Sequence, residues 1–216
     1  MAQELPFVSD EDLARQTQAG SLDAFEQLVY RYEGRVHAFV SQFCRHATDA
    51  RELTQDSFVK AFQKMDQFDS RRSFAAWLFT IARRKCIDRH RAAPPIADDP
   101  LPDQLHDTDP SELIARHEER QNLWRLARER LSENQFQAVW LHYGEDMDVA
   151  QIAQVLGKTK VHIKVILFRA RQILARELNP SLTLSQAIPA ASLSRTWPPL
   201  STNHQPTRRQ NNWRTI

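Results

Sequence analysis

Basic side chains recur along residues 160–176, a stretch with no acid before Glu177. At about 100° per residue, a helix would carry these cations on two shoulders: Lys160, Lys164 and Arg171 on one, and His162, Arg169 and Arg176 on the other. The arc between the shoulders holds Val161, Val165 and Phe168. Cations bind phosphate oxygens and methyl groups pack on thymine, so the pattern predicts a surface that contacts DNA. An ordinary solvated basic helix is the alternative.

A second basic group surrounds an aromatic residue. Arg71 and Arg72 precede Trp77, and the run 83–85 follows it. Helical spacing places five residues on one flank, outside the apolar stripe: Trp77, Thr80, Arg84, Asp88 and Arg91. Cations beside an exposed aromatic suit single-stranded or melting nucleic acid, through phosphate contacts and base stacking. A plain core aromatic is the alternative interpretation of Trp77.

Residues suited to catalysis or metal binding are few and scattered. Cys44 and His46 lie two apart and His37 seven before Cys44, but a metal site would need more converging ligands. No nucleophile–base pair or paired carboxylates stand out, and the four glycines exclude a glycine-rich phosphate loop. We therefore expect no enzyme activity, no cofactor and no metal.

The composition indicates a cytoplasmic protein. Two cysteines, Cys44 and Cys86, make no disulfide framework, which favours a reducing compartment. No apolar run is long enough to span a membrane, and the N-terminus lacks the pattern of a secretory signal. We expect no membrane insertion.

Helical periodicity runs through most of the chain, so the elements that position these residues are predicted to be helices. Side-chain caps mark their starts at Ser9, Ser21, Ser132 and Asp148, and Gly157 marks an end. On the helix predicted from 49 onward, the expected apolar stripe consists of Leu53, Phe58, Val59, Phe62 and Met65.

The segment 161–168 is ambiguous by propensity. It is rich in β-branched residues and alternates in character, which favours a strand. Apolar residues nevertheless continue at steps of three and four from Ile163 through Leu167 to Leu178. Because the longer period outweighs local propensity, we predict a helix.

Four segments follow from composition. Residues 93–122 contain 2 Lys or Arg and 8 Asp or Glu, and prolines crowd their first part. We predict an all-α protein with two small helical domains, a flexible Pro-rich acidic linker that leaves them at no fixed separation, and a disordered basic tail. The segments are 1–92, 93–109, 110–178 and 179–216.

Residues 148–157, a two-residue turn and the helix from Lys160 form a helix-turn-helix pattern, with the small Ala153 where two helices would cross. The run 49–62 and the run 74–83 look like the segment of bacterial sigma factors that binds core polymerase and melts promoters. The C-terminal pattern is similar to their second DNA-binding domain. Together these segments resemble the extracytoplasmic-function (ECF) group of the sigma-70 family.

The resemblance implies three sets of contact residues. Polymerase clamp helices would contact Glu52, Leu53, Gln55, Asp56, Phe58 and Lys60. The −10 element would be read and opened by Phe68, Asp69, Ser70, Arg71, Arg72, Trp77, Thr80, Arg83, Arg84 and Asp88. The −35 element would meet Lys160, Val161, His162, Lys164, Val165, Phe168, Arg169 and Arg171.

The implied function is promoter-specific transcription initiation, with RNA polymerase core, promoter DNA and an anti-sigma factor as partners in a stress response. One departure stands out, because the family usually starts its recognition helix with Gly-Thr-Val-Lys/Arg-Ser-Arg and residues 161–166 lack both hydroxyls and one arginine. The −35 sequence that is read should therefore differ from the typical one, or contribute less to promoter recognition. The alternative function is a stand-alone helix-turn-helix regulator that binds duplex DNA without polymerase. A helical adaptor that binds only proteins is a third possibility.

Overall fold

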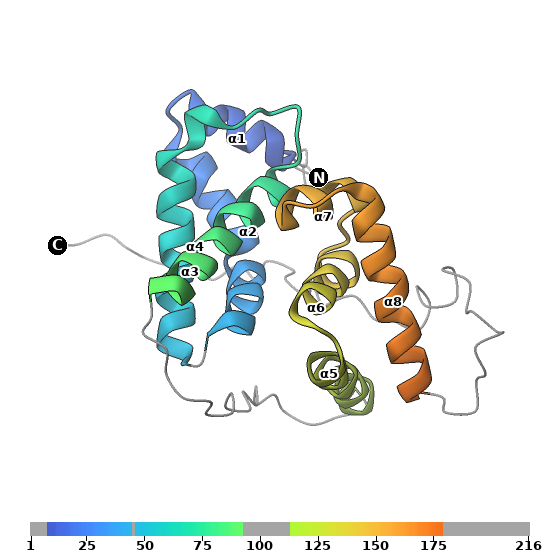
Figure 1. Ribbon diagram of the computed structural model, residues 1–216. Coiled ribbons are helices and arrows are strands. Elements are labelled where there is room, and N and C mark those ends of the chain that lie inside the picture. Colours follow the sequence, from blue (N-terminus) through green and yellow to red (C-terminus); the bar gives the residue numbers. More distant parts are fainter. Residues whose placement is uncertain (1–7, 45, 93–112, 179–216) are drawn as a thin grey trace, which may run out of the picture.

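The computed structural model describes residues 8–44, 46–92 and 113–178, and within these ranges every regular element is helical, as predicted (Figure 1). An N-terminal unit contains four α-helices and two short 3₁₀ turns: α1 (Asp10–Gln18), α2 (Leu22–Val40), η1 (Ser41–Phe43), α3 (Ala47–Gln63), η2 (Met65–Gln67) and α4 (Phe74–Ala92). A C-terminal unit follows, with α5 (Leu113–Arg130), α6 (Glu133–Val139), the π-helical turn η3 (Trp140–Gly144), α7 (Val149–Leu156) and α8 (Lys160–Leu178). The expected linker 93–109 and tail 179–216 lie outside the described residues.

The predicted caps at Ser9, Ser21 and Asp148 are present. The Ser9 hydroxyl accepts from the amide of Asp12, and the Ser21 hydroxyl accepts from that of Ala24. At α7 the Asp148 carboxylate accepts from two amides, while the Gln151 side chain accepts from the Asp148 amide. Such reciprocal bonds satisfy amides that have no partner within the helix.

The segment 161–168 is helical and forms the first half of α8, which confirms the choice of the longer period. Its buried residues are Ile163, Ile166, Leu167, Ala170 and Leu174. They pack mainly against α6 and α7, so tertiary burial overrides the strand propensity of the valines and isoleucines.

The N-terminal core is built on aromatic contacts between α2 and α4. The rings of Phe39 and Phe79 meet edge to face with centroids 5.2 Å apart, and Tyr32 meets Phe74 at 5.5 Å. In the C-terminal unit Trp124 on α5 and Trp140 on η3 lie 4.6 Å apart between centroids. Each unit therefore has its own hydrophobic centre.

The two units also contact each other. α7 packs against α4, and the ribbon shows it beside the N-terminal half of that helix (Figure 1). The sequence predicted two units with no fixed separation, whereas this structure holds them together.

Gly157 and Gly34 offer a matched pair of substitutions. Gly157 ends α7 at φ 64°, whereas Gly34 lies exposed inside α2, and neither has an atom within 4 Å of an added Cβ. We expect Gly157→Ala to lower the free energy of unfolding by about 1 kcal/mol. The added Cβ meets no other atom, but alanine is strained in the left-handed backbone conformation. Gly34→Ala should raise it by about 0.5–1 kcal/mol. Urea denaturation measures both, and an equal effect of the two would contradict the left-handed cap.

Candidate nucleic-acid and protein interfaces

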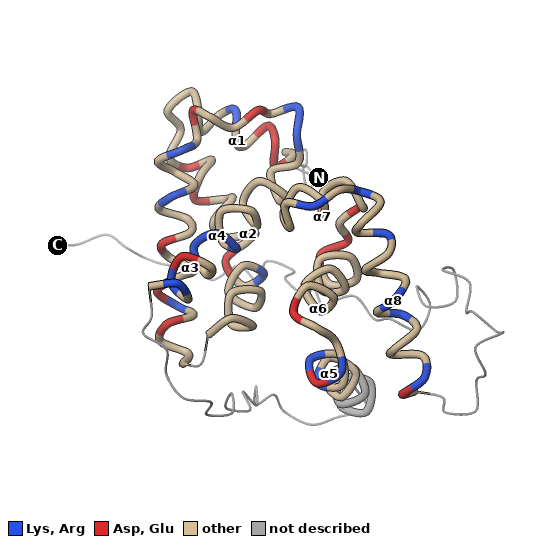
Figure 2. The backbone as a smooth tube through the Cα atoms, viewed as in Figure 1, with Lys and Arg blue, Asp and Glu red and all other residues tan. Residues whose placement is uncertain are grey.

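The outer arc of α8 is exposed along its length. Val161 is 72% exposed, Val165 41% and Phe168 51%, so the three apolar residues between the basic shoulders face solvent. Lys160, His162, Lys164 and Arg169 are exposed beside them, and Figure 2 shows the cations spaced along this helix. The Thr159 hydroxyl accepts from the His162 amide at 3.2 Å and caps the start of the helix. The arc therefore presents apolar groups flanked by cations.

Arg171 is held by a residue that the sequence analysis did not single out. Its Nε donates to the Tyr143 hydroxyl at 2.7 Å, and its guanidinium lies 5.8 Å from the centroid of the same ring. Tyr143 belongs to the π-helical turn, far away in the sequence. Local sequence patterns do not predict this pair, because its two residues lie 28 positions apart.

The loop 68–73 is anchored by α1. The Gln18 amide group donates to the carbonyls of Met65 and Phe68 at 2.9 and 2.8 Å. At the other end, Glu11 Oε1 accepts from the Phe74 amide at 3.0 Å and caps the first turn of α4. Glu11 and Gln18 thus fix both ends of a loop that the sequence predicted to contact DNA. The sequence did not indicate this anchoring role, because polar residues on α1 could equally face solvent.

Within that loop, Phe68 is buried whereas Asp69 and its neighbours lie at the surface. Phe68 meets the rings of Phe74 and Trp77 at centroid distances of 5.6 and 5.1 Å. Asp69 accepts from the backbone and side chain of Arg71, and these hydrogen bonds lower the pKa of the Asp69 carboxyl to about 2. Arg71 itself is exposed.

Trp77 lies between the two interpretations given to it. It is half-buried in the aromatic cluster, on a flank where Thr80 is half-buried and Arg84 and Asp88 are exposed. Arg83 does not share this flank. Its Nε donates to Gln137 Oε1 on α6 at 2.9 Å, so the structure brings it to the other unit.

The outer face of α3 carries the predicted polar residues of the protein-binding set. Glu52, Gln55 and Asp56 are exposed, whereas Leu53 and Phe58 are buried at 5% and 7% exposure and face the core. Lys60 is half-buried.

The predicted apolar stripe on α3 is wrong in part. Val59 is 49% exposed and Phe62 44%, beside the polar residues of the outer face. The buried arc is instead lined largely by small side chains, among them Ala50, Ser57 and Ala61. Small residues let neighbouring helices approach closely, which apolar periodicity alone does not reveal. The Phe62 ring also lies 4.9 Å from that of Phe25 on α2.

Ion pairs join α3 to α4 beneath this face. Lys85 Nζ lies 3.0 Å from Asp56 Oδ2, and Arg89 lies 2.9 Å from Asp49 and 3.7 Å from Glu52. These groups are largely exposed, so each pair contributes at most about 1 kcal/mol.

The remaining candidates add no chemistry to these surfaces. Burial raises the pKa of Cys44 to about 11 and that of Cys86 to about 12. Among the residues placed by the structure, no three histidine, cysteine or acidic side chains gather as a metal site would require. No helix in the described ranges is both long enough and apolar enough to cross a membrane.

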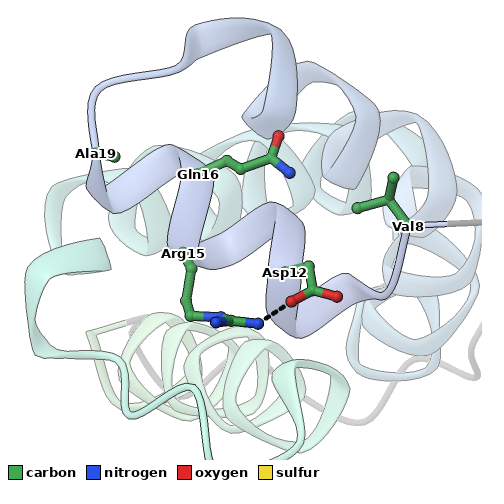
Figure 3. A pocket seen from close by; sticks show the side chains of 5 residues that line it. All are labelled: Val8, Asp12, Arg15, Gln16 and Ala19. Atoms are coloured by element: carbon green, nitrogen blue, oxygen red, sulfur yellow. Dashed lines mark hydrogen bonds and ion pairs between the residues drawn. The ribbon is translucent and has the colours of Figure 1, made fainter.

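A shallow pocket runs along α1, but none of the predicted contact residues lines it (Figure 3). Its lining includes Val8, Gln16 and Ala19, and Arg15 pairs there with Asp12. The candidate surfaces are therefore the outer faces of α3, α4 and α8 rather than a cavity.

Comparison with known proteins identifies the family. The family models for sigma-70 region 2 and sigma-70 region 4 match residues 28–94 and 122–174. The chain is 28% identical to the ECF RNA polymerase sigma factor BldN of Streptomyces coelicolor over 172 residues, 77% of this chain and 65% of that protein. It is 26% identical to the ECF RNA polymerase sigma-E factor of Salmonella typhimurium over 185 residues, 80% of this chain and 96% of the relative. The chain belongs to the sigma-70 family, in its ECF group.

A solved structure agrees with this assignment. The sigma factor superimposes on CnrH, solved in complex with the cytosolic domain of CnrY, with a TM-score of 0.57 and 27% identity. The match covers 80% of this chain and 99% of that one. The protein is thus a promoter-directing sigma factor rather than a stand-alone helix-turn-helix regulator, and RNA polymerase and promoter DNA are its partners.

The helical phase of α8 can be tested directly. Val165 is exposed and Ile166, its neighbour, is buried at 7% exposure. We expect Val165→Ser to change the free energy of unfolding by less than about 0.5 kcal/mol, because it alters the surface. Ile166→Ser should cost about 2 kcal/mol or more, because it leaves a cavity and a buried hydroxyl. Thermal denaturation of the two variants measures the difference, and a reversed order would show that the arc is wrongly placed.

Proposed function

We propose that this sigma factor binds RNA polymerase core through α3 and recognises the −10 and −35 elements through α4 and α8. The observation that carries the proposal is the outer arc of α8, where three exposed apolar side chains lie between two rows of cations. We further propose that the protein acts in the cytoplasm, has no catalytic activity and needs no cofactor.

The domain division that we propose follows these roles. Residues 1–92 would bind polymerase and the −10 element, and residues 110–178 would bind the −35 element. The acidic segment 93–109 would join them, and 179–216 would form a basic tail.

The polymerase-binding surface is the exposed face of α3. Glu52, Gln55 and Asp56 supply charge and hydrogen bonds, and the exposed Val59 and Phe62 supply apolar area. Protein interfaces combine an apolar centre with a polar rim, and this face has both. Leu53 and Phe58 pack into the protein's own hydrophobic core. They would therefore contribute to polymerase binding by holding the exposed face of α3 in position.

The −10 surface is the anchored loop and the adjoining flank of α4. Arg71, Arg72 and Arg84 are exposed and can reach phosphates, while the half-buried Trp77 leaves part of its side chain accessible to a base. The hydrogen bonds of Gln18 and Glu11 fix the two ends of this loop. A preformed loop loses less conformational entropy when single-stranded DNA binds.

The outer arc of α8 would read the −35 element through apolar as well as polar contacts. If the two rows of cations grip the two phosphate backbones, Val161 and Val165 face the base edges. Their methyl groups can pack on the thymine C5-methyl, whereas Lys164 can donate to a guanine. Arg171, held by Tyr143, is suited to a phosphate.

An anti-sigma factor is the third partner that we propose. CnrH was solved in complex with the cytosolic domain of a second protein, CnrY. The apolar residues exposed on α3 of this chain provide area for a protein partner of that kind.

Reconstitution with core polymerase tests the function as a whole. The purified protein and core should co-elute, and promoter-specific transcripts should appear only when both are present. Tight binding of the free protein to promoter duplex, without any effect on core polymerase, would instead support the regulator.

Two substitutions on α3 test the docking face. We expect Gln55→Ala combined with Asp56→Ala to weaken binding to core by about tenfold or more, because each substitution would leave a polar group of polymerase without its hydrogen-bond partner in the interface. Helicity should be unchanged, because both side chains are exposed. The matched control is Asn122→Ala with Glu129→Ala, an exposed amide and carboxylate on α5. Equal affinity of both double variants for core in a titration would refute the assignment.

Two substitutions on α8 separate specificity from affinity. Lys164→Ala should relax the preference at one base position, by about 1–3 kcal/mol against the correct base. Arg169→Ala should weaken all promoters alike and flatten the dependence of binding on salt, because it removes a phosphate contact. Selection from a randomised −35 element, with polymerase present, measures both. If Arg169→Ala changed the selected sequence and Lys164→Ala did not, the two roles would be exchanged.

A further inference from the structure

Tyr143 connects two elements of the C-terminal unit that are distant in the sequence. It lies in the π-helical turn η3, and its hydroxyl accepts from Arg171 Nε on α8 at 2.7 Å. The Arg171 guanidinium also lies 5.8 Å from the centroid of the Tyr143 ring. A hydroxyl and an aromatic ring therefore act on the same guanidinium, and together they restrict the rotation of a long side chain.

The tyrosine is itself held in place by its surroundings. The backbone of η3 closes with a bond from the Glu145 amide to the Trp140 carbonyl at 3.2 Å, which gives a wider turn than that of an α-helix. The ring of His142 meets the ring of Tyr143 edge to face, with centroids 4.6 Å apart. The Tyr143 side chain is half-buried. Its hydroxyl is therefore a fixed acceptor for Arg171.

Tyr143 orients Arg171 without cancelling its charge. In the ion pairs between α3 and α4, carboxylates orient the cations and also partly neutralise them. A tyrosine hydroxyl is uncharged at neutral pH. Glu177, the one acid of α8, pairs with Arg130 on α5 at 3.5 Å. The positive charge of Arg171 is therefore oriented by a neutral group and stays available to an anion.

The place of Arg171 on α8 suits a phosphate rather than a base. It lies on the same shoulder as Lys164, about two helical turns or 10 Å further along the helix. The first residues of a recognition helix contact base edges, whereas later residues lie beside the phosphate backbone. A long side chain that is ordered before binding loses less entropy when it meets a phosphate.

We propose that Tyr143 is a positioning residue for promoter binding: its uncharged hydroxyl orients Arg171 toward a phosphate of the −35 element and leaves the charge of the guanidinium intact. The inference rests on the role proposed above for α8. Tyr143 acts on the phosphate through Arg171 alone, so its contribution to affinity depends on that arginine. It adds affinity for every promoter sequence equally, because the phosphate carries no base identity.

A double-mutant cycle tests whether Tyr143 acts through Arg171. The probe is a fluorescein-labelled duplex with the −35 element recovered from the selection described above, bound by polymerase assembled with each full-length variant. Tyr143→Phe removes the acceptor and keeps the ring, so it should weaken binding about threefold or more. Arg171→Ala should weaken binding further, and adding Tyr143→Phe to it should have no additional effect. Tyr30→Phe, the same change at an exposed site on α2, should leave affinity unchanged.

A pair of side chains with the same shape tests the neutrality of the acceptor. Tyr143→Gln and Tyr143→Glu both offer an oxygen to Arg171, but only the second adds a negative charge. Each phosphate contact on duplex DNA contributes about 0.9 to the slope of log affinity against log salt concentration. Tyr143→Gln should keep the parent's slope, whereas Tyr143→Glu should lower it by about that amount. Combined with Arg171→Ala, the two variants should have equal slopes.

The outcomes separate positioning from a purely structural role. A Tyr143→Phe variant that binds as tightly as the parent would overturn the proposal, as would an equal loss with and without Arg171. Equal slopes for Tyr143→Gln and Tyr143→Glu, or a difference that persists with Arg171→Ala, would also overturn it. Should these two variants lose helicity by circular dichroism, the cycle with Tyr143→Phe decides alone. Failure of the proposed function would show earlier, because the selection would then recover no −35 sequence.

Discussion

Small side chains on the buried faces of α3, α7 and α8 let the helices of this sigma factor approach one another closely. On α3 the buried face contains Ala50, Ser57 and Ala61, each fully or nearly fully inaccessible. On the C-terminal side Ala153 and Ala170 take the same role on α7 and α8. Larger apolar side chains such as Val59 and Phe168 lie on the outer faces of α3 and α8.

The sequence predicted what depends on local chemistry. Caps such as Ser21 and Asp148 and the phase of α8 follow from hydrogen-bonding groups and spacing close in the chain. The exposure of Phe62 was missed, because an apolar pattern does not say which of two faces meets a neighbouring helix. The bonds of Arg83 to Gln137 and of Arg171 to Tyr143 were missed because they join residues distant in sequence.

Charge has two different roles in this structure. The pairs between α3 and α4, such as Lys85 with Asp56, are largely hydrated and leave their groups available to a partner. In the pair of Arg35 with Glu145 the carboxylate is 1% exposed, and the pair joins the two units. Both kinds of pair use the same residue types, so composition does not distinguish them, whereas the burial of the carboxylate does.

The burial of the two cysteines determines whether this protein could sense oxidants directly. Only the thiolate reacts readily with peroxide, and a pKa of about 11 for Cys44 leaves about one thiol in ten thousand ionised at neutral pH. Cys86, with a pKa of about 12, is ionised still less often. These are the only cysteines of the chain. An oxidative signal would therefore have to be chemically detected on another molecule and passed to this one by association or release.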